Sequence, residues 1–412
     1  MSVMTSPTSL HDIRVIDLSR ILAGPWATQL LGDLGAEIIK IEKPTVGDDT
    51  RHWGPPYIQS GVDKEGRTAA YNLCANRNKK SVTLDFTHPE GKQVLIQLIK
   101  ESDVLVENYK LGTLKRFGLD YDAIKEINPR LIYCSITGFG QTGPWAARAG
   151  YDFLIQGLGG LMSLTGRPDD QPGGGPLKVG VALADIMTGM YASTAILAAL
   201  HHRIKSGSGQ YIDMALLDTQ VAVLANQAMN YFHTGENPAR LGNAHPNVVP
   251  YQDFKTADGH IILAVGNDDQ FEKLMREIDL PELSHDPDFE SNEARNKNRE
   301  QLIRLIAEKI KTHESSDWIE RFEKIGVPCG PINSLEEVFD NEQVTSRGMQ
   351  IEMTHENYGA VPLVANPINL SETPIRYNYP PPELGEHTRA VLSELCQLSE
   401  DEIQELADKK VI

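Results

Sequence analysis

The amino-acid sequence predicts an α/β protein with a large Rossmann-like domain, built on a parallel sheet, and a second, smaller α+β domain. Three observations lead to this fold class. Apolar strand-like runs alternate with helical stretches up to residue 139. The length of 412 residues is sufficient for two domains. Turn residues become frequent after residue 240, which indicates a domain boundary near residues 225–240.

The first β-α-β unit lies at residues 13–42. Residues 13–18 (IRVIDL) and 36–42 (AEIIKIE) have the apolar character of buried strands, and a helical stretch separates them. Pro25 suits the first position of this helix, because the N–H that proline lacks has no intrahelical acceptor there. Gly32 and Gly35 indicate where the helix ends.

The same alternation continues along the chain, and it predicts parallel strand pairing with helices on both faces of the sheet. Pro89 indicates the start of the next helix. The expected strands cover 81–86, 103–109, 131–139 and 210–216. The expected helices cover 89–101, 114–117, a stretch ending before Asn128, 184–207 and 217–235.

The second half of the chain has a different pattern. Residues 253–265 predict a hairpin with its turn at Asp258 and Gly259. Helical patterns follow at 296–312 and 315–325, with a further helix ending near Asp340. We expect an extended segment at 349–370 and two closing helices after the prolines at 380–382.

Composition and charge exclude several classes of protein. Hydrophobic residues at 40% and charged residues at 23% are typical of a globular protein. The net charge of −18 argues against nucleic acid or an anionic membrane as a partner. No run approaches the roughly 18–20 uninterrupted apolar residues of a membrane span, and the first residues lack the apolar core of a signal peptide. We therefore expect a cytoplasmic protein, or one in an organelle matrix.

Common catalytic and metal-binding motifs are missing. The turn after the first strand reads SRILAGPWATQ instead of the G-x-G-x-x-G of nicotinamide enzymes. The P-loop, the G-x-S-x-G elbow and H-E-x-x-H are also absent from the sequence. The four cysteines form no C-x-x-C pair, so the sequence predicts neither a zinc site nor a disulfide framework: Cys74, Cys134, Cys329 and Cys396.

Basic residues cluster at 76–81 (NRNKKS) and 107–118 (ENYKLGTLKRFG), each beside the end of an expected strand. Doubly wound sheets bind ligands at such ends, so these clusters suit a phosphate-bearing cofactor. The alternative is that they are ordinary solvated loops.

Asp185 stands at the start of the long expected helix, after the most glycine-dense part of the chain. A carboxylate at that position is a favourable N-cap, which would explain the residue without any catalytic role. The functional alternative is a covalent nucleophile that attacks an activated acyl group. With a reference pKa of about 3.9, such a carboxylate would need no general base at neutral pH.

With these residues in view, the sequence resembles the class III CoA-transferases, the CaiB/BaiF type that includes formyl-CoA:oxalate and carnitine CoA-transferases. The resemblance covers essentially the whole chain. It is carried by ten segments in order: AGPWATQLLGDLGAEIIKIEKPTVGDDTR, NRNKKSVTLD, VENYKLGTLKRFGL, SITGFGQTGP, GYDFLIQGLGGLMSLTG, ALADIMTG, LGNAHPNVVPY, AVGNDDQF, GVPCGPIN and LGEHT.

The resemblance implies a ring-shaped chain in an interlaced homodimer. It divides the chain into a large Rossmann-like CoA-binding domain at 1–225, completed by 380–412, a small domain at 226–345 and a return linker at 346–379. Coenzyme A would enter as a substrate, with no cofactor held permanently. The catalytic aspartate of the family falls on Asp185. The family's CoA-contacting positions fall on Leu22, Ala23, Lys43, Asn76, Asn108, Tyr109, Arg116 and Phe117.

Lys43 and Arg116 are the natural partners of the CoA phosphates. Oxalate enzymes carry glutamine where this chain has Leu22, and a glycine run where it has GNAHPN, so oxalate itself is disfavoured. The GYD and GLMSLTG segments look like those of dicarboxylate-using relatives, so the resemblance favours short dicarboxylates such as succinate or glutarate. His245 and His387 fall in family segments, where they could line the site or serve the structure.

Three alternatives remain open. The same fold family includes α-methylacyl-CoA racemases, which need a histidine where this chain has Tyr151, and a phenol of pKa near 10 is a poor base at neutral pH. The second alternative is a transferase for a carnitine-like or aromatic acid. The third is a non-catalytic acyl-CoA-binding protein, which would need Lys43 and Arg116 but not Asp185.

Overall fold

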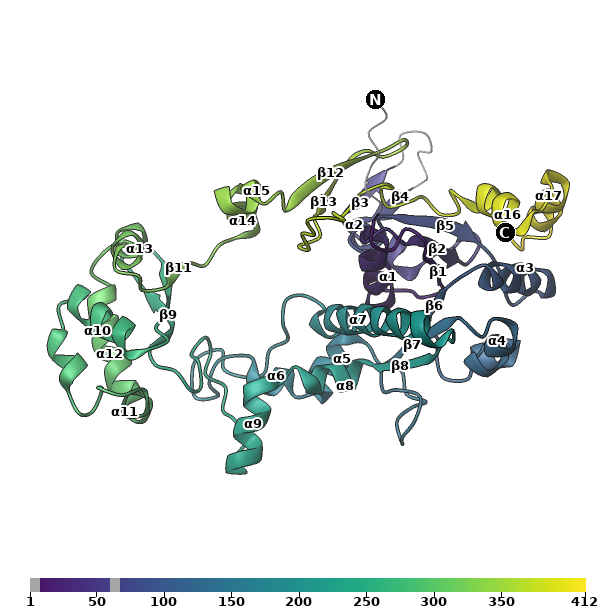
Figure 1. Ribbon diagram of the computed structural model, residues 1–412. Helices are drawn as coiled ribbons and strands as arrows, with labels where there is room; N and C mark the ends of the chain where they lie inside the picture. Colours follow the sequence, from purple (N-terminus) through teal and green to yellow (C-terminus); the bar gives the residue numbers. More distant parts are fainter. Residues whose placement is uncertain (1–7, 60–66) are drawn as a thin grey trace. The chain divides into compact units, whose positions relative to one another are not determined.

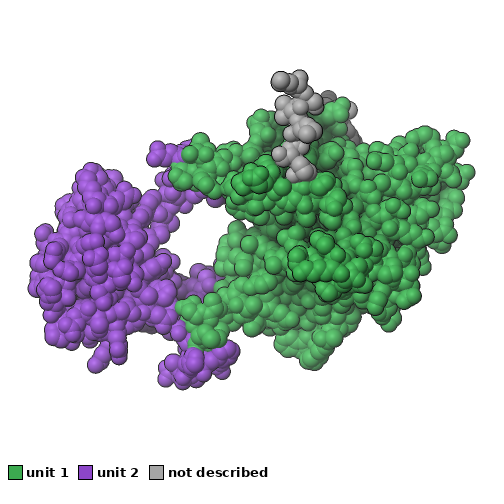
Figure 2. Space-filling model, in the orientation of Figure 1, with its two compact units in different colours: residues 1–161, 179–229, 343–412 green, residues 162–178, 230–342 purple. Residues whose placement is uncertain are grey.

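The computed structural model describes residues 8–59 and 67–412, and its elements are labelled in Figure 1. The chain forms two compact units (Figure 2). The first comprises residues 1–161, 179–229 and 343–412, and the second comprises 162–178 and 230–342.

A six-stranded parallel sheet forms the centre of the first unit, in the order β5-β2-β1-β6-β7-β8. Ile16 on β1 lies opposite Ile39 on β2 and Leu105 on β6. The parallel pairing confirms the α/β fold class and the Rossmann-like arrangement. The strands are β1 (Arg14–Asp17), β2 (Glu37–Glu42), β5 (Lys79–Thr83), β6 (Val104–Glu107), β7 (Ile132–Thr137) and β8 (Tyr211–Ala215).

Each face of this sheet is covered by its own apolar core, because the strands are apolar on both faces. Adjacent residues of β1 show the division: Ile16 belongs to one core and Val15 to the other, and both are fully buried. The first core is covered by α3 (Pro89–Lys100), η2 (Leu114–Phe117), α4 (Tyr121–Ile127), α16 (Thr388–Cys396) and α17 (Glu400–Asp408). The second is covered by α1 (Ala23–Asp33), α7 (Leu183–Ser206) and α8 (Leu216–Ala222).

Local sequence signals account for several helix ends. Pro89 is the first residue of α3, as predicted. Helix α1 begins at Ala23, two residues before Pro25, so the proline is still in the first turn, where no N–H has an intrahelical acceptor. Ser399 and Glu402 form a capping box at the start of α17.

Two predicted elements differ from the structure. The single helix expected at 217–235 is two helices, α8 and α9 (Ala225–Thr234). The chain breaks between them at Ala225, the first residue of α9, whose φ of +45° cannot continue the helix from α8. The segment expected to be extended at 349–370 does form extended strands, but a turn that was not predicted pairs them as an antiparallel hairpin of β12 (Gln350–His355) and β13 (Gly359–Val364).

The second unit is an α+β fold with its own core. A three-stranded antiparallel sheet consists of β9 (Tyr251–Lys255), β10 (His260–Ala264) and β11 (Cys329–Pro331), and the predicted Asp258–Gly259 turn joins β9 to β10. Trp318 and Phe322 stack in the core. The helices that cover it are α10 (Asp268–Glu277), η3 (Pro281–His285), α11 (Asn292–Lys297), α12 (Arg299–Ile310) and α13 (Ser315–Lys324).

The remaining elements are short. Most belong to connecting segments whose sequence gave no clear periodicity. They are η1 (Asp49–His52), β3 (Tyr57–Gln59), β4 (Arg67–Ala69), α2 (Ala70–Leu73), α5 (Asp152–Leu158), α6 (Leu161–Leu164), α14 (Leu335–Asp340) and α15 (Glu342–Ser346).

The compact units can be set beside the predicted domains. Residues 162–178, which we assigned to the large domain, belong to the second unit, where Arg240 pairs with Asp169 and the Gly242 N–H bonds to the Gly166 carbonyl. Residues 346–379, expected as a return linker, belong to the first unit. There Asn366 donates to Asp33, and Tyr377 packs on the guanidinium of Arg77.

Helix α7 has the length and apolar composition of a membrane span, which the sequence analysis did not anticipate. Half of its most apolar window is buried inside the protein, and it packs against α1 and β7. Core helices of soluble proteins share these properties, so this one helix is weak evidence for a membrane. The cytoplasmic location stays a prediction.

Candidate active site

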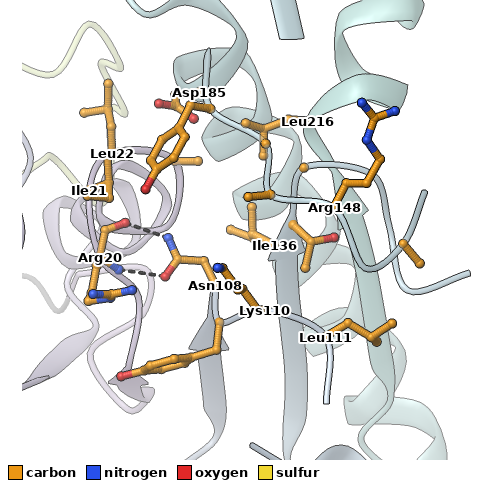
Figure 3. Close-up of a pocket in the computed structure, with 18 residues that line it drawn as sticks. Arg20, Ile21, Leu22, Asn108, Lys110, Leu111, Ile136, Arg148, Asp185 and Leu216 are labelled. Carbon is orange, nitrogen blue, oxygen red and sulfur yellow. Dashed lines mark hydrogen bonds between the residues drawn. The ribbon is translucent and has the colours of Figure 1, made fainter. Parts of the chain in front are cut away.

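A crevice lies at the carboxyl ends of β1, β6 and β7, beside the starts of α1 and α7 (Figure 3). All of its lining residues belong to the first unit. Parallel sheets bind ligands at this edge, because helix starts and strand ends meet there. The crevice brings together five of the predicted site residues: Leu22, Ala23, Asn108, Tyr109 and Asp185.

Asp185 is the third residue of α7 and is only 8% exposed. It is not the N-cap that the sequence allowed, because Ala182 holds that position. The cap is supplied by Asp152 instead, whose Oδ1 accepts from the Ala184 N–H at 2.8 Å. No hydrogen bond or ion pair from any described residue reaches the Asp185 carboxylate. The N-cap explanation for this residue is therefore wrong, although the residue still lies in the first turn of α7.

The environment of Asp185 favours its neutral form. Burial raises the pKa of the carboxyl to about 7, and the negative charge of Asp152 contributes in the same direction. The sequence alone suggested a pKa near the reference value. In the free protein, Asp185 is therefore close to half protonated at neutral pH, and the carboxylate is neither paired nor strongly solvated. A poorly solvated carboxylate is a better nucleophile than one in water.

The start of α1 is the second element of the crevice. Leu22 is its N-cap and has no side-chain hydrogen bond to offer, so the first N–H groups of the helix are left for another acceptor. Gly189 explains how α1 and α7 come so close: a Cβ there would lie 2.7 Å from the Ala23 carbonyl oxygen. Helix N-termini attract negative charge, so this one suits an oxyanion beside Asp185.

The predicted CoA-contacting residues are not all in this crevice. Lys43 lines a neighbouring pocket at the ends of β2 and β5, which shares Arg20 and Tyr109 with the crevice. Phe117 does not line either pocket, but it packs edge-on against Phe86, which lines the second. Arg116 is exposed on η2 and lines neither pocket.

Asn76 is buried within the first unit, where its Nδ2 donates to the Asn72 carbonyl at 2.7 Å. Most of the neighbouring cations are engaged in ion pairs. Arg77 pairs with Asp33 at 2.6 Å, and Lys79 pairs with Asp17 at 3.1 Å. The cluster at 76–81 is therefore neither a phosphate site nor a solvated loop, as we had considered, but mainly an internal charged network.

Three cations line the crevice that were not among the predicted CoA contacts, although Lys110 lies in the basic cluster at 107–118: Arg20, Lys110 and Arg148. Figure 3 shows Arg20 and Asn108 on one wall and Arg148 on the other. Arg20 stands two residues before Leu22, and Lys110 directly follows Tyr109, so adjacency to the selected positions was a usable signal. Arg148 had no such signal. Its guanidinium lies over the rings of Trp145 and Phe139.

The other candidate residues lie elsewhere. His245 is in the second unit, where its Nδ1 accepts from the N–H groups of Asn247 and Val248. His387 precedes α16 and packs against Tyr379, and it does not line the crevice. Tyr151 does line it and is 61% exposed. Among residues 8–59 and 67–412, no cluster of histidine, cysteine and acidic side chains could hold a metal ion.

Comparison with known proteins defines the class to which this chain belongs. The model of CoA-transferase family III matches residues 10–388. The chain therefore belongs to the CoA-transferase family III, and it is an enzyme of that class.

Two relatives with named activities are similar to this chain over nearly its whole length. The chain is 50% identical to a succinate–glutarate CoA-transferase of Agrobacterium fabrum over 386 residues, which is 94% of this chain and 95% of the relative. It is 42% identical to the human succinyl-CoA:glutarate CoA-transferase over 411 residues, or 100% of this chain and 91% of the relative.

Solved structures agree with the fold. A CaiB/BaiF family protein from Brucella suis is 49% identical with a TM-score of 0.82, and the match covers 94% of this chain and 100% of that one. A hypothetical protein from Mycobacterium tuberculosis is 28% identical with a TM-score of 0.81, covering 94% and 99%.

Proposed function

We propose that this enzyme transfers coenzyme A from succinyl-CoA to glutarate or a similar short dicarboxylic acid. Two relatives that match nearly the whole chain carry names with this pair of acids. One acyl thioester is broken and one is made, so the reaction needs no ATP. The single observation that carries the chemistry is Asp185, a buried carboxylate without a hydrogen-bonding or ionic partner among the described residues, beside an uncapped helix start.

In the proposed course, the Asp185 carboxylate attacks the thioester carbonyl of succinyl-CoA. The C–S bond breaks, which gives a mixed anhydride and free CoA thiolate. The thiolate then attacks the Asp185 carbonyl carbon, releasing succinate and leaving an aspartyl-CoA thioester. Glutarate attacks this thioester to give a second anhydride and thiolate. Attack of the thiolate on the glutaryl carbonyl forms glutaryl-CoA and restores Asp185.

Each addition places negative charge on a carbonyl oxygen, and the enzyme must stabilise that charge. The N–H groups at the start of α1, at Leu22 and Ala23, are suited to this task because of their position beside Asp185. Gly138 and Gly150 approach each other so closely in the same crevice that a Cβ on either would clash with the other. This close packing limits the space for water, which would hydrolyse an anhydride.

For the CoA moiety, we propose a path from the Lys43 pocket past Tyr109 and Asn108 to Asp185. Support comes from the residues that the two pockets share, Arg20 and Tyr109. Lys43 and Arg20 are placed to meet the CoA phosphates, and Asn108 and Leu22 to meet the pantetheine arm. Arg116 is a weaker candidate than the sequence suggested, because it lines neither pocket.

The test combines turnover with trapping of the intermediate. Purified enzyme with succinyl-CoA and glutarate should produce glutaryl-CoA without ATP, measured by mass spectrometry. With succinyl-CoA alone, hydroxylamine should convert Asp185 to a hydroxamate. Asp185→Asn should lower the rate by about 10⁴-fold or more, the scale for loss of a nucleophile. Substantial turnover by this variant would end the mechanism and favour a different nucleophile.

The racemase alternative requires two bases on opposite faces of the carbon α to the thioester. Here Tyr151 occupies the position where a racemase has histidine, and Asp152 is engaged in holding the start of α7. We expect a 2-methylacyl-CoA in deuterium oxide to remain unlabelled at the α-position. Rapid deuteration without CoA transfer to any acid would support the racemase.

We also propose that the enzyme is a homodimer. Support comes from exposed apolar side chains on two helices: Ile204 on α7 is 83% exposed and Phe232 on α9 is 68% exposed. Light scattering after size exclusion should give twice the chain mass of 45.6 kDa. A monomer at micromolar concentration would contradict this proposal.

A further inference from the structure

The segment between β1 and α1 has an unusual backbone. Ile21 has a φ of +71°, in the left-handed region. A β-branched residue is strongly disfavoured there, because its side chain crowds the backbone. Ile21 lines the crevice that contains Asp185, directly before Leu22 and Ala23. Backbone strain of this kind persists only where the surrounding structure enforces it, and it is concentrated at functional sites.

Side chains from three other parts of the first unit enforce this backbone. Asn108 accepts from the Arg20 N–H at 2.9 Å and donates to the Arg20 carbonyl at 2.6 Å. Lys40 donates to the Ser19 carbonyl at 2.9 Å. The Ile21 N–H donates to both carboxylate oxygens of Asp48, at 3.2 and 3.3 Å. The strained residue itself is thus held by Asp48.

Asp48 is well suited to act as a fixed acceptor. It is 1% exposed, and its carboxylate pairs with the fully buried Lys40 at 2.9 Å. The Thr50 N–H and hydroxyl both donate to its Oδ1, at 3.0 and 2.8 Å. Glu42 accepts from the Asp48 N–H at 2.9 Å. These partners leave the side chain one orientation, with an oxygen directed at the Ile21 N–H.

We propose that Asp48 is a positioning residue for CoA transfer, which holds Ile21 in its left-handed conformation and thereby keeps the start of α1 beside Asp185. This inference rests on the proposed function, because it assigns the Leu22 and Ala23 N–H groups to the developing oxyanion. Lys40 links Asp48 to the strained segment, because its ammonium group donates both to the Asp48 carboxylate and to the Ser19 carbonyl.

We expect loss of Asp48 to affect the rate more than binding. Without the Asp48 acceptor, Ile21 can relax to a negative φ, and the backbone that follows it turns away from the crevice. The ground-state thioester needs no oxyanion donor, but the transition state does. A shift of about 1 Å in such donors lowers a rate by about 100-fold.

The experiment uses Asp48→Ala, which removes the acceptor, and Asp33→Ala as a matched control. Asp33 is likewise a buried carboxylate that pairs with a buried cation, Arg77, but it has no hydrogen bond to the segment Ser19–Leu22. We expect Asp48→Ala to lower kcat for succinyl-CoA:glutarate transfer by about 100-fold, with the Kd of free CoA little changed. Asp33→Ala should show a lowered Tm with kcat retained. Equal losses of kcat in the two variants would contradict the proposal.

A double-mutant cycle with Ile21→Gly isolates the role of backbone strain. Glycine adopts a positive φ without strain, so the loss caused by Asp48→Ala should be several-fold smaller in the Ile21→Gly background. If Asp48→Ala alone fails to fold, the double variant should still fold and turn over. An unfolded double variant, or an identical loss in both backgrounds, would assign Asp48 to the fold alone.

The two proposals fail in different ways. If the wild-type enzyme does not transfer CoA from succinyl-CoA to glutarate, the proposed function is wrong. If the wild type does transfer CoA and Asp48→Ala does so equally fast, only the role of Asp48 is wrong.

Discussion

Two buried regions of the first unit hold carboxylates in opposite ways. In the buried charged network, Asp17 lies close to Lys79 and Asp48 lies close to Lys40. Burial alone would raise the pKa of both carboxyls, but the positive charges of these lysines outweigh burial and lower both pKa values. In the crevice, Asp185 is similarly buried, yet its pKa rises to about 7 because no cation offsets the burial and Asp152 adds a negative charge.

This difference depends on where the lysine and arginine side chains of the first unit lie. Lys40, Lys79, Arg51 and Arg77 are buried and paired with carboxylates that fix backbone, so they are not available to substrate. Asp185 receives no such partner and remains reactive. The ion pairs of the charged network hold the backbone around the crevice in place. Asp185 can act as a nucleophile because no cation among the described residues pairs with it.

The largest effect is expected from breaking the network. Lys79→Met leaves Asp17 buried beside Ser19 and Thr28 but without its ion-pair partner. Loss of one member of a buried pair costs about 3–5 kcal/mol of the free energy of unfolding. Urea denaturation measures this loss. The double variant Asp17→Asn/Lys79→Met should recover part of it, and no recovery would mean that the two side chains are not energetically coupled.

Asp185→Asn should have the opposite effect on stability. The folded-state pKa of Asp185 is raised to about 7, from its ordinary value of 3.8. Folding is therefore penalised as pH rises from about 4 to 7, because only the unfolded chain loses the proton in that range. The variant should be more stable than wild type by up to about 4 kcal/mol at pH 8 and no more stable at pH 4. Equal differences at both pH values would contradict the raised pKa.

The phosphate-binding role of Lys43 can be measured against Arg116. Lys43→Ala should weaken binding of CoA by about 1.5–3 kcal/mol, the range for a hydrogen bond to a charged group. Arg116→Ala should have a smaller effect, because Arg116 lines neither pocket. Isothermal titration with CoA and dephospho-CoA tests both variants, with Lys100→Ala on α3 as a surface control. A larger loss for Arg116 would reverse the assignment.

The smallest effect is the pH dependence of the rate. Since the carboxylate is the proposed nucleophile, kcat/KM should fall about tenfold per pH unit below pH 7 and level off above it. Asp152→Asn keeps the acceptor for the Ala184 N–H but removes a negative charge, so its profile should shift to lower pH. A profile unchanged by this substitution would mean that Asp152 does not influence the titration of Asp185.

Much of the fold could be predicted from the sequence, because strands and helices in an α/β unit have different apolar periods. The strands at Arg14–Asp17 and Glu37–Glu42, the helix start at Pro89 and the Asp258–Gly259 turn lie where expected. The break at Ala225 was missed, because the sequence around it has no glycine or proline to indicate a helix end and only the tertiary structure imposes the positive φ.

The sequence by itself determined the family, the α/β class and the position of Asp185, because these depend on residue order and local pattern. Only the tertiary structure decided which charges face the substrate. Lys43, Lys79 and Arg116 look alike in the sequence, yet one lines a pocket, one is buried against Asp17 and one is exposed on η2. The tertiary structure also decides the pKa of Asp185 and the hydrogen bonds from the Ile21 N–H to Asp48. Both depend on desolvation and on side chains far apart in sequence, which no local pattern records.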